Sequence, residues 1–385
     1  MSASKKRTIW IGLTTLLFVL LALFFFIYWW IWGQFEESTN DSYVNGNMII
    51  LTPQVEGIVT AIYVDNTELV EPGQPVIELD RHFYEIALDQ AKAVLADRVR
   101  QVSQLFLQVE ELEASQKVAM AALIRAALDY EHRAALVEEG GVAREEFEHS
   151  QTTLLSAYAT LTEVEKSYEK ALVEVNHTTL TTHPKVEQAK ALLRQAFLLL
   201  HRCTVLAPTR GIISQRKAQV GQWVKAEDPL MALVPIDQIW VDANFREVSL
   251  KYLRIAQPVE MVSDMYGEEI KFHGQVVGLN PGTGSVFSIL PPQNATGNWI
   301  KIVQRVPVKI GFSDLDELKR RPLLLGLSMT VTVDTHDRHG MQLPETAHET
   351  VLYSTSSYEN ELLGVEQIID DIIEKNSGPM NRLEI

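Results

Sequence analysis

Two long stretches of the chain repeat apolar residues every seven positions, and a second apolar row follows three residues after the first. One stretch covers residues 81–139 and the other covers residues 142–202, so the two are almost equal in length. Such heptads predict helices that pack as a left-handed coiled coil. Gly140 and Gly141 stand between the stretches and allow the chain to turn. We therefore expect an antiparallel helical hairpin over residues 81–202, with arms of roughly 90 Å.

The heptad pattern has two kinds of irregularity. Arg98 and Arg133 occupy positions that are apolar elsewhere in the second row of the first arm. In the second arm, a threonine-rich segment ending at Pro184 interrupts the pattern, and the core row moves from Val175 to Val186. That interval is one heptad plus about four residues, a stutter that locally unwinds a coiled coil. We expect a kink or a short break at residues 176–184, with the hairpin preserved.

The segments before and after the hairpin repeat one another at a constant offset of 154 residues, without a gap. Each half predicts short strands separated by glycine and proline turns, and neither half is long enough to bury a core alone. The equal arms would bring the halves together, so we expect residues 42–80 and 203–235 to form one β-sandwich. The matching pairs are Gly57 and Gly211, Ile58 and Ile212, Val70 and Val224, Pro75 and Pro229, and Leu79 and Leu233.

This split repeat resembles the lipoyl or biotinyl carrier fold, cut at the hairpin that would present the modified lysine. In a carrier that tight turn holds a lysine, whereas here the helical hairpin stands in its place. We therefore reject a swinging-arm function and interpret Gly57 and Gly211 as turn glycines of a lipoyl-like sandwich.

The pattern changes to period two after Ile236, which predicts a small antiparallel β-barrel over residues 236–340. The glycines at positions 282 and 284 resemble a phosphate-binding loop only superficially, because no Gly-Lys-Ser/Thr follows them. We interpret residues 281–298 as a long contact loop. The predicted strands of the barrel are 240–245, 259–262, 270–277, 299–306, 308–310 and 329–333.

Residues 341–385 form a polar tail with one short amphipathic helix at 365–375, for which membrane-proximal packing and a loose tail are equal alternatives.

Residues 9–32 contain no charge over 24 positions and end in a cluster of aromatic residues that includes Trp29 and Trp32. This length is enough to span a bilayer core of about 30 Å. The basic residues Lys5, Lys6 and Arg7 would keep residues 1–8 in the cytoplasm and send the rest of the chain across. A cleaved signal peptide would have a shorter apolar core and a small-residue cleavage site, so we predict an uncleaved transmembrane anchor.

Composition excludes several functions. The formal net charge of −16 argues against nucleic acid as a partner. The single cysteine, Cys203, cannot form an intrachain disulfide and falls at a heptad core position. His336 and His339 are the closest histidine pair and are weak evidence for a metal site. No nucleophile elbow, zinc motif or dinucleotide fingerprint is present, so we predict neither an enzyme nor a cofactor.

Anchor, split repeat, helical hairpin and barrel, in that order, resemble the HlyD/EmrA family of membrane fusion proteins over roughly residues 5–335. The most specific likeness lies in the barrel, at residues 240–247, 255–258 and 277–307. The resemblance implies a periplasmic adaptor in the inner membrane of a Gram-negative cell. Its implied partners are a proton-driven, EmrB-like drug transporter of the major facilitator type, a TolC-like outer-membrane channel, and further copies of itself side by side. Hydrophobic drugs are further candidate ligands.

The resemblance also assigns residues to two candidate sites. Channel-docking relatives carry an Arg, a Leu and a Ser at the hairpin tip; Leu136 fits the Leu position, while His132 and Ala143 occupy the other two. The expected docking tip comprises His132, Arg133, Leu136, Gly140, Gly141, Val142, Ala143 and Arg144. The expected barrel motif and assembly loop comprise Trp240, Asp242, Asn244, Phe245, Gly282, Gly284, Asn294, Gly297, Asn298 and Trp299.

The sequence thus predicts a multidomain α+β protein that serves as the adaptor of a tripartite multidrug efflux pump. The alternative is an adaptor for ATP-driven export of a peptide or protein, which the same architecture would serve. The neighbouring transporter gene separates these two. A structural coiled-coil tether without a transport role is disfavoured, because a bare tether has no need of a split sandwich at its base.

Overall fold

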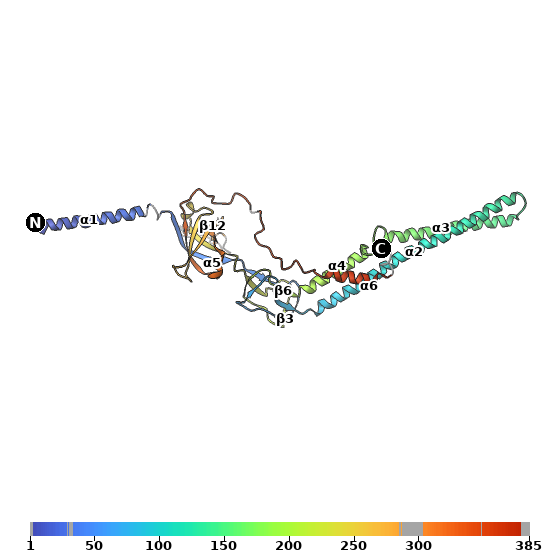
Figure 1. The fold of residues 1–385 in the computed structure, drawn as a ribbon, viewed down its shortest axis with the longest axis horizontal. Helices are drawn as coiled ribbons and strands as arrows, with labels where there is room; N and C mark the ends of the chain where they lie inside the picture. The colour runs from blue at the N-terminus through green and yellow to red at the C-terminus, as the bar shows by residue number, and fades with distance from the viewer. Residues whose placement is uncertain are drawn as a thin grey trace, which may run out of the picture.

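The computed structural model describes residues 3–28, 30, 34–284, 286, 303–347 and 349–378. The molecule is elongated: helix α1 (Ala3–Tyr28) lies at one end, two β-structured regions lie in the middle, and the tip of a helical hairpin lies at the other end (Figure 1). The α+β class, the long hairpin and the barrel that the sequence predicts are confirmed.

Helix α1 covers most of the predicted anchor. The described side chains of this helix are largely apolar and exposed, with Trp10 at 73% and Phe18 at 72% exposure. Within the part of the chain that the structure describes, no helix combines the length and apolar character needed to cross a membrane. Trp29 and Trp32, which belong to the predicted aromatic cluster, lie outside the described residues.

One strand from before the hairpin and five from after it close into one antiparallel barrel in the order β1-β10-β13-β12-β11-β14. Its core contains Phe245 and Phe272, and the short helix α5 (Leu315–Arg320) adds Leu318 to that core. A 3₁₀ turn, η2 (Ser249–Lys251), follows β10. The strands are β1 (Glu36–Gly46), β10 (Ile239–Arg246), β11 (Pro258–Ser263), β12 (Lys271–Leu279), β13 (Arg305–Phe312) and β14 (Ser328–Asp334).

Two features of the barrel differ from the sequence-based expectation. Strand β1 pairs with β10 and β14, so residues 42–46 lie in the barrel rather than in the sandwich segment 42–80. The polar alternation of β1 gives no sign of a distant partner. Strand β13 continues through Pro307, where the sequence suggested two strands, because a strand tolerates proline where no ladder bond needs its missing N–H. Residues 299–302 of the first of those strands lie outside the described residues.

Within the described residues, the segments that flank the hairpin form two four-stranded sheets with a shared core. The sheet orders are β2-β9-β7-β4 and β6-β5-β3-β8, so each sheet takes strands from both sides of the hairpin. Neither flank therefore builds a sheet alone. The strands are β2 (Ile49–Leu51), β3 (Gly57–Ile62), β4 (Leu69–Val70), β5 (Pro75–Leu79), β6 (Thr204–Leu206), β7 (Gly211–Ser214), β8 (Trp223–Val224) and β9 (Met231–Val234).

Strand pairing in this sandwich repeats the offset found in the sequence. Gly57 pairs with Val224 in one sheet, and the equivalent residues Gly211 and Val70 pair with each other in the other sheet. The two halves of the repeat therefore exchange strands symmetrically, and the sequence repeat corresponds to a two-fold-like repeat of the sandwich.

Two turns follow the same offset and show where glycine is needed. Thr67 and its equivalent Gly221 have φ of 72° and 82°, and Gly73 and its equivalent Glu227 have φ of 77° and 72°. A positive φ in this range is easily adopted by glycine and costs other residues free energy. Each turn thus has an unstrained copy in one half of the repeat and a strained copy in the other.

The hairpin has one continuous arm and one interrupted arm. Helix α2 (His82–Glu138) packs against α3 (Arg144–Val175) and α4 (Pro184–His201). The expected short break is present at residues 176–183, between α3 and α4. His183 caps α4, since its Nδ1 atom accepts the Lys185 amide at 3.2 Å. The Nζ atom of Lys190 donates to the Thr181 carbonyl at 2.7 Å, which holds the non-helical segment against the arm.

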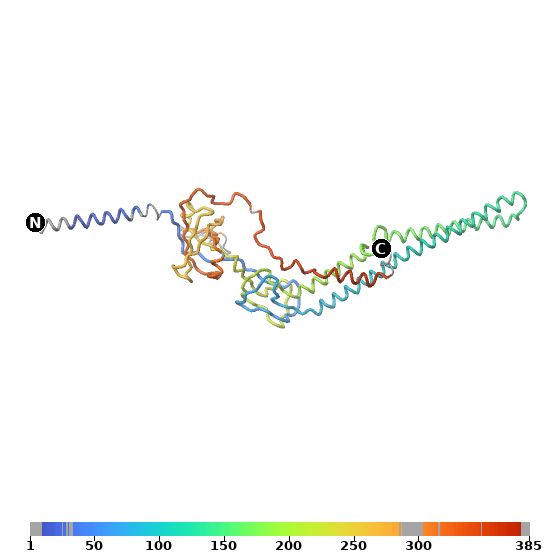
Figure 2. Tube along the Cα trace, viewed as in Figure 1, coloured from blue at the N-terminus to red at the C-terminus, as the bar shows by residue number. Residues whose placement is uncertain are grey.

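The tail returns to the base of the hairpin. Its helix α6 (Val365–Asn376) lies beside α2 and α4 (Figures 1 and 2) and shares a buried cluster with them. This packing explains one irregularity of the heptads: Arg98 is exposed, and Val99 is fully buried in its place. The core row shifts by one residue because α2 contacts a second helix, α6, as well as the opposite arm. The alternative of a loose tail is therefore wrong for residues 365–376, which pack against the base of the hairpin.

Candidate functional site

The tip of the hairpin is closed by the two glycines that follow α2. Gly140 has a φ of 75°, a conformation that favours glycine. The Gly140 amide donates to the Val137 carbonyl at 3.3 Å, and the Gly141 amide donates to the Leu136 carbonyl at 2.9 Å. These two bonds form a Schellman motif, which satisfies carbonyl groups that a helix end leaves unpaired. The Gly-Gly pair thus ends α2 and reverses the chain.

Contacts between the two arms fix the tip. The Tyr130 and Phe147 rings stack with their centroids 5.3 Å apart. Nearer the turn, Nη1 of Arg133 donates to the Glu146 carbonyl at 3.2 Å, and its Nε lies 3.3 Å from an Asp129 carboxylate oxygen. Arg133 therefore replaces an apolar heptad contact with a polar bridge. The sequence did not single out Glu146, because a bond to a backbone carbonyl leaves no residue signature. Asp129 was also missed, although its place four residues before Arg133 is a spacing that indicates an ion pair on a helix.

Several predicted tip residues face outward. His132, Leu136 and Ala143, which occupy the positions of the docking motif, are all exposed. Leu136 is 45% exposed, a large apolar side chain at the far end of the rod. Val142 is half-buried, and Arg144 lies 3.3 Å from a Glu148 carboxylate oxygen in an exposed ion pair. The structure therefore brings Leu136 and Val142 to the turn and leaves the other side chains at its rim.

The rim of the tip is acidic. Arg133 and Arg144 are both in ion pairs with neighbouring carboxylates. Exposed carboxylates surround them, from Glu131, Glu138, Glu139, Glu145, Glu146 and Glu148. Such a surface, apolar at its centre and negative at its edge, complements a partner that has an apolar pocket with a basic rim.

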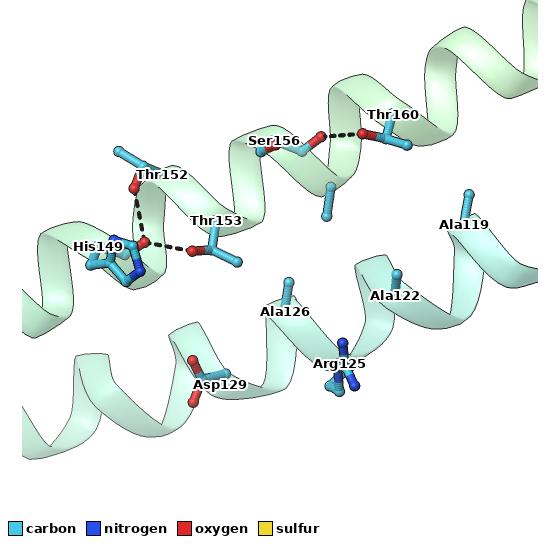
Figure 3. Close-up of a pocket in the computed structure, with 11 residues that line it drawn as sticks. Ala119, Ala122, Arg125, Ala126, Asp129, His149, Thr152, Thr153, Ser156 and Thr160 are labelled. Carbon is cyan, nitrogen blue, oxygen red and sulfur yellow. Dashed lines mark hydrogen bonds between the residues drawn. The ribbon is translucent and has the colours of Figure 1, made fainter.

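A groove of about 730 Å³ runs between the arms below the tip (Figure 3). Its wall is built mainly from small side chains, and the hydroxyls of Thr152 and Thr153 both donate to the His149 carbonyl at 2.8 Å. The Thr160 hydroxyl likewise donates to the Ser156 carbonyl at 3.0 Å. These hydroxyls bond to their own helix, and the charged or titratable side chains of the wall are those of Arg125, Asp129 and His149. We interpret it as a consequence of small heptad residues.

The predicted barrel motif lies along β10. Phe245 is 1% exposed and belongs to the barrel core, whereas Trp240, Asp242 and Asn244 alternate with the core residues. Nε1 of Trp240 donates to Oδ1 of Asp242 at 3.0 Å, and Nζ of Lys309 lies 3.7 Å from the Trp240 ring centroid. This cation–π contact links β10 to β13.

Asn244 belongs to a polar cluster that joins three strands of the barrel. Its Nδ2 donates to Oδ1 of Asp41 at 3.2 Å, and the Thr39 hydroxyl donates to its carbonyl at 3.0 Å. Arg305 lies 3.0 Å from the same Asp41 carboxylate. The motif residues of β10 thus close the barrel between β1 and β13. A role of these residues in assembly stays a prediction.

The remaining predicted residues are placed as follows. Gly282 and Gly284 follow β12, and the Gly284 amide donates to the Arg305 carbonyl at 3.3 Å. Gly57 and Gly211 are the first residues of β3 and β7, so they lie in paired strands rather than in turns. The other four residues of the assembly loop lie outside the described residues: Asn294, Gly297, Asn298 and Trp299.

The described residues contain no group of three or more His, Cys, Asp and Glu side chains that could hold a metal ion. His336, one of the two closest histidines, bonds instead to Asp334, with Nδ1 2.5 Å from Oδ1. In the described part of the chain, the length of the hairpin separates its exposed tip from the sandwich and the barrel (Figure 1).

Comparison with known proteins finds one matching family model and several similar chains. The family model described as "EMRA, alpha-helical hairpin domain" matches residues 84–203. The multidrug export protein EmrA of Escherichia coli (strain K12) is 40% identical over 352 residues, covering 91% of this chain and 90% of that protein. The fatty acid resistance protein FarA of Neisseria gonorrhoeae is 42% identical over 323 residues, covering 83% and 82%. A solved structure of the periplasmic adaptor protein EmrA covers 78% of this chain and 99% of its own, with 21% identity and a TM-score of 0.39.

Proposed function

Because this chain belongs to the EmrA family of periplasmic adaptor (membrane fusion) proteins, we propose that it is the adaptor subunit of a tripartite multidrug efflux pump. It is a non-enzymatic, EmrA-like export adaptor. Its transporter partner is of the major facilitator type, and its channel partner is TolC-like. The names of its relatives, which include multidrug export and fatty acid resistance, favour small apolar cargo over the alternative of ATP-driven peptide or protein secretion.

The observation that carries this proposal is the spatial separation of the tip from the rest of the molecule. The arms are held in register by the Tyr130–Phe147 stack, and the turn exposes Leu136 beyond it. A helix of this length places the tip roughly 85 Å from the base of α2. A rod of that reach with an apolar residue at its end is suited to docking on a distant channel.

The location and assembly belong to the same proposal. The chain is attached to the inner membrane of a Gram-negative cell through residues 9–32, with its bulk in the periplasm, and copies assemble side by side. The attachment is supported by the uncharged run of 24 residues and by the basic cluster before it. In Figure 1, α1 leaves the barrel on the side opposite to the hairpin, so the membrane and the channel would lie at opposite ends of the molecule.

Replacing Leu136 with Asp tests the docking tip. The added charge should repel the apolar centre of the channel contact, because an unpaired carboxylate is costly to bury. We expect reduced drug resistance and reduced co-purification with the channel in cells that carry Leu136→Asp. Leu128→Asp is the matched control, since Leu128 is also exposed, at 50%, and lies about two turns earlier on α2.

Both variants should fold and reach the membrane, which thermal unfolding and fractionation would establish. Normal resistance and normal channel recovery with Leu136→Asp would contradict the tip assignment. Equal losses with both variants would show that the rod surface in general, rather than the tip, contacts the channel. Absence of a multi-spanning transporter from the purified native complex would contradict the efflux function itself.

A further inference from the structure

The tail of the chain contacts each of the three bodies that precede it. Beyond β14, the Met341 carbonyl accepts the Ile255 amide at 2.9 Å, which holds the tail on the barrel. The Thr355 hydroxyl donates to the Pro208 carbonyl at 2.5 Å, and the Ser357 hydroxyl donates to the Ala207 carbonyl at 3.1 Å, both in the sandwich. Figure 2 shows the tail crossing from the barrel to the hairpin, where α6 lies.

Helix α6 inserts one apolar stripe into the base of the hairpin. Val365, Ile369 and Ile373 recur every four residues and are 1%, 1% and 8% exposed. They share a buried cluster with residues of both arms, which are Leu88, Leu95, Val99, Val102, Val186, Ala189, Leu193 and Ala196. A helix that fits its stripe into a groove between two other helices is a common mode of peptide recognition. The base of the hairpin is therefore a helix-binding groove.

Polar contacts fix the direction and register of α6. Arg194 of α4 donates to both carboxylate oxygens of Glu366, at 2.6 and 2.9 Å. At the other end of α6, Nη1 of Arg100 donates to Oδ1 of Asn376 at 2.7 Å. Just before α6, a guanidinium nitrogen of Arg202 lies 3.3 Å from a carboxylate oxygen of Glu361. Because these contacts lie at both ends of α6, a shift of α6 along the groove or a reversal of its direction would break them.

Apart from the tail, the rod meets the sandwich at its two chain connections, between β5 and α2 and between α4 and β6. Beside these connections, Tyr84 of α2 and Leu199 of α4 pack against the sandwich core, and the Tyr84 hydroxyl donates to the Glu56 carbonyl at 2.8 Å. Such a pair of short connections permits bending at the junction. We propose that residues 355–377 form a strap that docks in the groove of the same chain and fixes the angle between the hairpin and the sandwich. The strap adds contacts on both sides of that junction, on the sandwich through Ser357 and on the rod through α6.

Reversal of the Arg194–Glu366 ion pair tests the strap in the purified full chain. Arg194→Glu places two carboxylates together and should release α6, which hydrogen exchange would record as amide exchange about tenfold faster over residues 365–376. The double variant Arg194→Glu with Glu366→Arg should restore most of the protection. Unchanged exchange in the single variant, together with unchanged exchange in Ile369→Asp, would overturn the docking. Gln367→Asp is the matched control, because Gln367 is exposed on the same helix.

The angle is measured separately, by the distance distribution between spin labels at Glu111→Cys on α2 and Val220→Cys on the sandwich. Both native side chains are exposed. Release of α6 should broaden this distribution, and the charge-reversed pair should narrow it again. Release without broadening would overturn the strap. Restored protection in a mixture of the two single variants would also overturn it, because α6 would then dock between copies.

These readouts stand apart from the efflux proposal. Exchange and label distances are measured without a transporter or a channel, so the strap can fail while the efflux function holds, and the reverse.

Discussion

Gly211 shows how one residue can decide the packing of the sandwich. A Cβ atom added there would lie 2.6 Å from the Val234 carbonyl oxygen and 2.9 Å from Cδ1 of Leu233. At Gly57, the equivalent position in the first half of the repeat, the nearest atom is the Leu79 Cβ at 3.5 Å, which is an ordinary contact. The two glycines occupy equivalent positions of the repeat, but only Gly211 lacks space for a side chain.

We expect Gly211→Ala to lower the free energy of unfolding by about 1–3 kcal/mol, because overpacking forces neighbouring backbone to move. Gly57→Ala is the matched control and should have a clearly smaller effect. Urea unfolding of the full chain, followed by tryptophan fluorescence, would measure both. Equal losses for the two variants would contradict the close approach at Gly211.

Cys203 is a second case in which burial decides the chemistry. The side chain is fully buried, and burial raises the pKa of its thiol to about 11. Since the thiolate is the reactive form, we expect almost no alkylation of the native protein at pH 8 and rapid alkylation in denaturant. Mass spectrometry after timed exposure to iodoacetamide would test this. Complete labelling of the folded chain within minutes would be inconsistent with it.

At the scale of elements, the sequence predicts the helix α6 but not the surface on which it packs. Its amphipathic pattern predicted a helix, but a stripe of isoleucines does not identify its partner. The sign of that partner is on α2, where Arg98 occupies a heptad core position and the apolar Val99 follows it. In a hairpin of two helices this is an exception, whereas beside a third helix Val99 is the residue that must be buried.

The ion pair of α6 predicts a pH dependence. The Arg194 guanidinium lowers the pKa of Glu366 below its ordinary value of 4.5. A lowered pKa in the folded state stabilises the fold above pH 4.5, and that contribution is lost as pH falls through the folded-state pKa. The Glu366 side chain is 60% exposed, so we expect about 0.5–1 kcal/mol at neutral pH.

Unfolding free energies of the native chain and of Glu366→Gln, measured from pH 7 to pH 3, would test this contribution. The two curves should differ at pH 7 and converge at the acid end. A constant difference across the range would mean that the glutamine acts through packing rather than through the lost charge.

At the scale of the whole molecule, we expect drug export to depend on the length of the hairpin. Removing residues 109–115 from α2 and 162–168 from α3 deletes one heptad from each arm at opposing heights and keeps the core rows in phase. The rod should shorten by about 10 Å. If the tip must reach a channel at a fixed distance, resistance should fall although the tip residues are intact. Drug susceptibility and channel co-purification are the measurements.

Removing only residues 109–115 is the control for this deletion. It leaves the arms unequal by one heptad, so contacts between the arms on the base side of the deletion cannot stay in register and the protein itself should be destabilised. Full resistance from the evenly shortened rod would contradict a fixed reach.

Much of the architecture could be predicted because it rests on periodic signals. Heptads indicated the hairpin, and the constant offset indicated a sandwich with strands from both flanks. Contacts without periodicity could not be predicted in the same way. The assignment of β1 to the barrel and the bond from Arg133 to the Glu146 carbonyl depend on pairing across the fold, which no local pattern records.

The exchange of strands in the sandwich also fixes the order in which the protein can be made. Strands β3 and β8 pair directly, yet the whole hairpin is translated between them. The sheets of the sandwich therefore cannot be completed, and the strands of the first half keep unpaired edges, until β9 has left the ribosome. The hairpin forms from contacts close in sequence on either side of its turn, so it can fold earlier and turn a long loop closure into a short one. During biosynthesis, the rod acts as the template that brings the two halves of its own base together.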